Sequence, residues 1–82
     1  MAFDIAKAIE SIGGAVNKGF SYAEKAKDKQ SESEIIKTNK RYIRALNVAE
    51  ELILLTYRYY NDFNQKDQEQ YNQLIQKFIK YN

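Results

Sequence analysis

Residues 33–61 read SEIIKTNKRYIRALNVAEELILLTYRYYN, and this stretch decides the fold. Its large apolar side chains recur at steps close to three and a half residues, which places them on one face of an α-helix. The spacing predicts one helix of roughly 40 Å, at 1.5 Å per residue. The stripe is wide enough to suit a helix that faces two neighbours. Its members are Ile35, Tyr42, Leu46, Ala49, Ile53, Tyr57 and Tyr60, widened by Ile36, Ile43, Leu52 and Leu55.

The residues before this helix predict another helix and a linker. A second apolar stripe indicates a helix over residues 3–27, with a kink or break possible in principle at the pair Gly13-Gly14. Residues 25–34 carry no large apolar side chain and are typical of a linker. Ser31 and Glu34 have capping-box spacing, and Ser33 is an alternative N-cap. The stripe consists of Ile5, Ile9, Ile12, Val16, Phe20 and Ala23.

The residues after the long helix predict a turn and a third helix. Asn61-Asp62-Phe63-Asn64 has the chemistry of a turn, and Asn64 is a candidate N-cap for a helix over residues 65–81. A turn this short predicts that helices 33–61 and 65–81 form an antiparallel hairpin. The apolar face of the third helix holds Tyr71, Leu74, Ile75, Phe78 and Ile79.

The sequence therefore predicts a single all-α domain of three helices over residues 1–82. The N-terminal helix could pack on its own hairpin, exchange with another subunit, or meet a partner or a membrane surface. Three helices of this length make a thin core, and a homodimer that shares helix faces is plausible on that ground.

Composition excludes several classes of function. The chain of 82 residues has no cysteine and no histidine. The usual zinc, haem and iron–sulfur sites therefore cannot be built, and the most common general base is missing. The adjacent acids Glu50 and Glu51 point about 100° apart on a helix and cannot serve one site. We expect no enzyme, no catalytic residue, no metal and no cofactor.

Charge and hydropathy add little about partners. The chain carries 13 Lys and Arg against 11 Asp and Glu, for a net charge of +2. This excess is too small to predict a polyanionic partner by itself. No apolar run approaches the 18 residues of a membrane span, and the first residues lack the pattern of a signal peptide. The sequence predicts a cytoplasmic protein.

One flank of the long helix is basic. Steps of three and four residues bring four cations into line along one side of this helix. They are Lys37, Lys40, Arg41 and Arg44. Such a flank could bind phosphates or an acidic protein surface, with Tyr42 near enough to stack on a base. The alternative is a solvated flank whose long stems cover the edge of the core.

The densest aromatic segment is Tyr57-Arg58-Tyr59-Tyr60. Consecutive helical residues point about 100° apart, so these three tyrosines cannot all face one core, and we expect Tyr59 to be exposed. Tyrosine and arginine are enriched at binding hot spots. Tyr57, Arg58, Tyr59 and Phe63 are therefore the predicted protein interface, although tyrosines also sit half-buried at domain edges.

Residues 33–82 resemble small proteins encoded by phages and prophages of low-GC Gram-positive bacteria. The segments that show this resemblance are rich in Lys, Asn, Ile and Tyr. They read IIKTNKRYIRALNVAEELILLTYRYYNDF and KDQEQYNQLIQKFIKYN. The resemblance is one of composition over about half of the chain. It implies an accessory protein that acts by binding in the host cytoplasm: a virion or assembly component, or an inhibitor of a host or defence protein. We expect a protein-interaction module first and a small nucleic-acid-binding protein second.

Overall fold

The computed structural model describes residues 3–81 and is helical throughout its regular structure. Its elements are α1 (Ile5–Lys27), α2 (Glu32–Tyr57), the short 3₁₀-helix η1 (Tyr60–Asp62) and α3 (Gln65–Tyr81). This confirms the predicted all-α, three-helix fold. Within the described range, no helix is both long enough and apolar enough to cross a membrane.

Each helix begins at a polar residue that satisfies a free backbone N–H group. The Asp4 carboxylate accepts a hydrogen bond from the backbone N–H of Lys7 at 3.0 Å, at the start of α1. The Ser31 hydroxyl accepts one from the N–H of Glu34, and the Asn64 side chain accepts one from the N–H of Asp67. The predicted caps at Ser31 and Asn64 are therefore confirmed.

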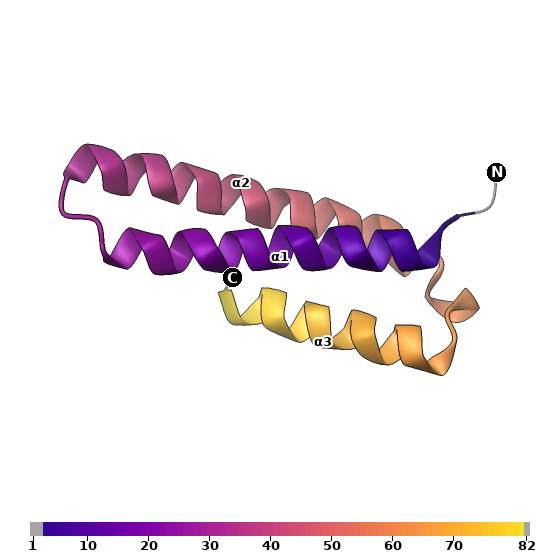
Figure 1. Ribbon diagram of the computed structural model, residues 1–82. Coiled ribbons are helices and arrows are strands. Elements are labelled where there is room, and N and C mark those ends of the chain that lie inside the picture. The colour runs from indigo at the N-terminus through magenta and orange to yellow at the C-terminus, as the bar shows by residue number, and fades with distance from the viewer. Residues whose placement is uncertain (1–2, 82) are drawn as a thin grey trace.

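The three helices alternate in direction, with α1 between the other two (Figure 1). Most of the close packing joins α1 to α2, less joins α1 to α3, and very little joins α2 to α3. Helices α2 and α3 do run antiparallel across a short connection, as predicted, yet the closely packed hairpin is α1 with α2. Helix α1 is thus the central element, although the sequence pattern favoured α2 for that place.

Small side chains explain why α1 and α2 pack so closely. A Cβ atom placed on Gly19 would lie 3.4 Å from Cδ2 of Leu46 and 3.7 Å from Cβ of Ala45. Ala49 is completely buried at the same junction. Helices with small residues at their contact can bring their backbones together, whereas α3 presents large side chains. Helix α1 continues without interruption through Gly13-Gly14.

The core is thin and lies along α1. The molecule measures 47 × 23 × 16 Å, and its radius of gyration of 14.4 Å exceeds the roughly 12 Å of a compact domain of this length. The widened part of the α2 stripe is consequently exposed, including Ile36, Ile43 and Leu55. The expectation that α2 faces two neighbours is wrong for this part of its surface. The buried apolar residues are Ile9, Ile12, Ala15, Val16, Leu46, Ala49, Phe63 and Tyr71.

The predicted ends of two segments need correction. Helix α2 ends at Tyr57 and not near residue 61, because the backbone turns at 58–59 and continues as η1. This turn lets Tyr60 and Phe63 pack on Tyr71, and that tertiary packing outweighs local helix propensity. The predicted linker 25–34 shrinks to residues 28–31, because the helices on both sides extend into it.

Candidate protein-binding groove

The predicted aromatic interface does not form one surface. Phe63 is only 6% exposed and belongs to the core, so it cannot serve as a contact residue on the folded chain. The Tyr59 ring stacks on Phe3, with centroids 3.9 Å apart, and is half-buried. The outward tyrosine is Tyr57, which is 65% exposed, so the expectation for Tyr59 was wrong. Arg58 is exposed.

Tyr71 explains why the side chains of Tyr60 and Phe63 turn toward the core. Its ring packs edge-on against Phe63 at 5.5 Å and lies 5.7 Å from the Tyr60 ring. Its hydroxyl donates a 2.8 Å hydrogen bond to the carbonyl of Ile53 in α2. Burial raises the pKa of the Tyr71 phenol above its usual value of 10.0, and neighbouring tyrosines add to the effect. The phenol therefore stays protonated and joins α3 to α2.

The predicted basic flank is exposed along its whole length but divides into two parts. Arg41 and Arg44 line a groove between α2 and α1, whereas Lys37 and Lys40 lie outside it. The structure therefore brings two of the four cations to a concave site.

This groove has a volume of about 590 Å³, and we call it the α1/α2 groove. We call its apolar lining the floor of the groove. Small residues such as Ala15 and Ala45 contribute to this floor, and the larger side chains of Val48 and Leu52 complete it. Open space borders Gly14 on the α1 side of the groove, since a Cβ atom there would meet no neighbour within 4 Å. The lining consists of Ser11, Gly14, Ala15, Lys18 and Tyr22 from α1, and Arg41, Arg44, Ala45, Val48 and Leu52 from α2.

The electrostatics of the groove are one-sided. Lys18, Arg41 and Arg44 are all exposed cations, and none of the ten lining residues is acidic. At the end near Tyr22, the Lys25 ammonium lies 5.9 Å from the centre of the tyrosine ring and adds a further cation. Because the whole chain carries only +2, this is a local concentration of positive charge. The groove thus combines an apolar floor with a cationic rim.

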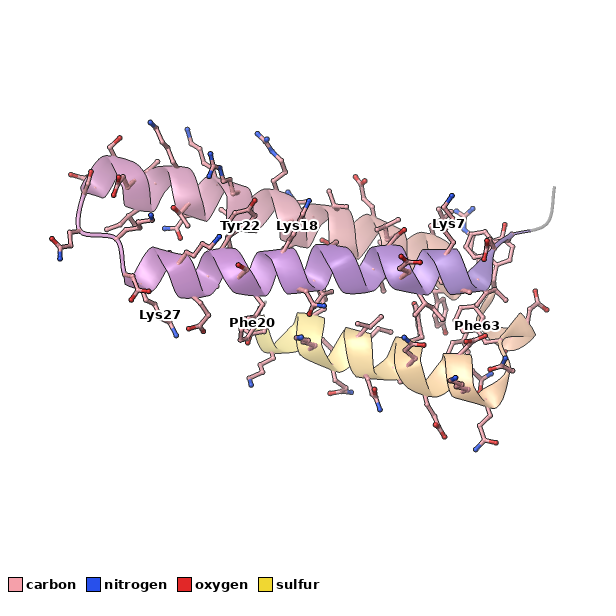
Figure 2. The ribbon with its side chains drawn as sticks, viewed as in Figure 1. Lys7, Lys18, Phe20, Tyr22, Lys27 and Phe63 are labelled. Carbon is pink, nitrogen blue, oxygen red and sulfur yellow. The ribbon has the colours of Figure 1, made fainter. Side chains whose placement is uncertain are left out.

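Lys18 and Tyr22 were missed as site residues by sequence reasoning. Figure 2 shows both on the edge of α1 toward α2, whereas Phe20 lies on the edge toward α3. The sequence does contain a helical spacing that places these residues on one edge of α1. Steps of three and four residues join Ser11, Ala15, Lys18 and Tyr22. This spacing could not be interpreted without knowing that α2, and not solvent, lies beside that edge.

The groove has the chemistry of a candidate binding site. Its side chains offer cations, a phenol and apolar surface, which suit recognition of an anionic amphipathic group. Elsewhere within residues 3–81, no group of three His, Cys, Asp or Glu side chains lies close enough together to hold a metal ion.

Comparison with protein-family models, curated proteins and solved structures finds no match to this chain.

Proposed function

We propose that this chain is a non-catalytic module that binds another protein, and that it takes an acidic amphipathic helix of that partner into the α1/α2 groove. The observation that carries the proposal is the groove lining, in which Lys18, Arg41 and Arg44 surround an apolar floor without any acid. Grooves of this kind recognise helices through an apolar stripe, and the flanking charges give orientation.

The dimensions of the groove support a helix as the occupant. Along α1 the lining extends from Ser11 to Tyr22, and along α2 from Arg41 to Leu52. Eleven residue steps on each helix span roughly 16 Å, or about three helical turns. A docked helix would place its apolar side chains against Val48 and Leu52. Its carboxylates would then reach Arg41 and Arg44, whose guanidinium groups can bind a carboxylate with two parallel hydrogen bonds.

The compositional resemblance of residues 33–82 to small phage and prophage proteins supports a biological setting for this module. In that setting the chain is an accessory protein that occupies a surface of a virion component, or of a host or defence protein. Its proposed place of action is the cytoplasm of the host cell.

A nucleic-acid partner is the second candidate, favoured by the exposure of Lys37, Lys40, Arg41 and Arg44 along one helix. Phosphate binding would use all four cations, since each contact adds a similar electrostatic contribution. It would make no use of the apolar floor beside Val48 and Leu52. The floor is why we rank a protein helix above a phosphate backbone.

Reversing the charge of the groove is expected to abolish partner binding. In affinity capture from cells that naturally produce the chain, Arg41→Glu/Arg44→Glu should lower recovery of the specific partner by about tenfold or more, because two carboxylates would then face its acids. A matched control is Lys29→Glu/Lys37→Glu, which changes the net charge equally at exposed positions outside the groove. The control should recover the partner as the unchanged chain does.

The same capture separates the two candidate functions. A protein partner should survive nuclease treatment and show the difference between the groove variant and its control. A nucleic-acid partner should disappear with nuclease and weaken steeply between about 50 and 200 mM salt. It should also be weakened by the control variant, because that variant reverses Lys37 of the basic flank. Equal recovery by the groove variant and the unchanged chain would refute the α1/α2 groove as the binding site.

A further inference from the structure

A second surface, separate from the α1/α2 groove, runs along the outside of α2. Its seven residues follow one another at alternating steps of four and three, which is the spacing of the contact positions in a coiled coil. All seven are exposed. The large apolar members among them are between 48 and 65% exposed. We call this surface the α2 seam, and it consists of Ile36, Lys40, Ile43, Asn47, Glu50, Leu54 and Tyr57.

Neither α1 nor α3 covers the α2 seam. Helix α1 packs on the opposite side of α2, where Leu46 and Ala49 are buried. Helix α3 makes little close contact with α2 beyond a few anchor points. One of these is a hydrogen bond from the Tyr42 hydroxyl to the Tyr81 carbonyl, and Tyr42 lies on the same face of α2 as the buried Ala49.

The order of charges along α2 makes this surface complementary to itself. Lys40 belongs to the first half of the seam and Glu50 to the second. In an antiparallel pair of identical helices centred near residue 45, Lys40 of each copy lies opposite Glu50 of the other. The same register sets Ile36 of each copy opposite Leu54 of the other. A two-fold axis repeats every pair, as a symmetric dimer requires.

We propose that a second copy of this chain covers the α2 seam, forming an antiparallel, two-fold symmetric dimer through α2. The unlike charges fix the register, because sliding either helix by a turn removes the pairs between Lys40 and Glu50. The exposed isoleucine and leucine side chains supply the apolar contact. The dimer leaves the residues that define the cationic rim of the α1/α2 groove outside the seam.

Charge reversal and rescue test this dimer directly. Light scattering and sedimentation should give the unchanged chain twice its 9.6 kDa mass. Lys40→Glu alone and Glu50→Lys alone should each raise the dimer dissociation constant by about tenfold or more, because like charges then face each other twice. The double variant Lys40→Glu/Glu50→Lys should restore the dimer. Both positions are exposed, so helicity should not change in any of the three.

The matched control is Glu51→Lys, which makes the same charge change one residue along and about 100° around the helix. It should leave the dissociation constant unchanged. A monomeric mass for the unchanged chain would overturn the proposal, as would single variants that remain dimeric. Failure of the double variant to restore the dimer, or an equal effect of Glu51→Lys, would also overturn it. None of these outcomes bears on partner capture through the groove, since no exchanged residue lines it.

Discussion

Replacing Tyr71 by alanine is expected to lower the free energy of unfolding by about 3–5 kcal/mol, the usual cost of removing a buried aromatic side chain. Tyr71 is 1% exposed, contacts the rings of Tyr60 and Phe63, and donates its hydroxyl to the Ile53 carbonyl. A domain of this size has roughly 4–12 kcal/mol in total. The variant should therefore be largely unfolded, or melt far below the unchanged chain, in thermal and urea denaturation followed by circular dichroism.

Two variants separate the contributions of Tyr71. Tyr71→Phe keeps the ring and removes only the hydroxyl, so it should cost about 0.5–1.5 kcal/mol, the usual net value of one hydrogen bond. Leu55→Ala truncates a large apolar side chain that is 48% exposed on α2, outside both the α2 seam and the α1/α2 groove, and should cost less than about 1 kcal/mol. All measurements need one protein concentration, because association would add to apparent stability. Similar costs for Tyr71→Ala and Leu55→Ala would contradict the aromatic core.

The second large effect is expected at Ile12, in the middle of α1. Ile12 is completely buried at the centre of the packed stripe, where α1 meets its neighbours. Ile12→Ala removes three carbon atoms from this site and leaves a cavity, which costs about 2–5 kcal/mol. Urea denaturation at constant concentration would measure the loss as a lower midpoint.

Ile79→Ala is the matched control, because it makes the same chemical change on a helix surface that is 59% exposed. It should change the free energy of unfolding by less than about 1 kcal/mol, since little apolar area leaves a packed environment. If both alanine variants lost the same stability, α1 would not be the central helix of the core.

Much of the fold could be predicted from local sequence. The starts of α2 and α3 follow from single polar side chains, Ser31 and Asn64, and the structure confirms both caps. The α1 stripe through Ile9, Ile12 and Val16 is buried as its spacing predicts. Local hydrogen bonding and helical periodicity determine these features, so they can be inferred without knowledge of the tertiary packing.

The choice of packing partners could not be predicted in the same way. The short connection before α3 favoured a tight pair of α2 and α3, yet α1 and α2 make the closest contact. The deciding residues are Gly19, Ala45 and Ala49, whose small side chains carry no strong hydrophobic signal of their own. Their effect depends on two helices meeting at those positions, and one helix examined alone does not reveal it.

The candidate site shows the same division between local and tertiary information. The exposure of the basic flank followed from sequence, and Arg41 and Arg44 were among the residues named for it. The sequence could not predict that Arg41 and Arg44 line a groove while Lys37 and Lys40 lie outside it. The groove exists only where α1 packs against α2. Phe63 was misassigned to a surface for a related reason. Its burial depends on how α3 folds back, because the Tyr71 ring of that helix packs edge-on against Phe63.

The most direct test of the proposed function uses Lys18, which lines the α1/α2 groove together with Arg41 and Arg44. Figure 2 shows Lys18 on the edge of α1 toward α2. Lys18→Glu and the matched Lys7→Glu make the same charge change at exposed positions on α1, inside and outside the groove respectively. Affinity capture with Lys18→Glu should recover about tenfold less of the protein partner that depends on Arg41 and Arg44, because a carboxylate then lies among the groove's cations. Lys7→Glu should recover the normal amount. Equal recovery of that partner by the two variants would contradict a binding site between α1 and α2.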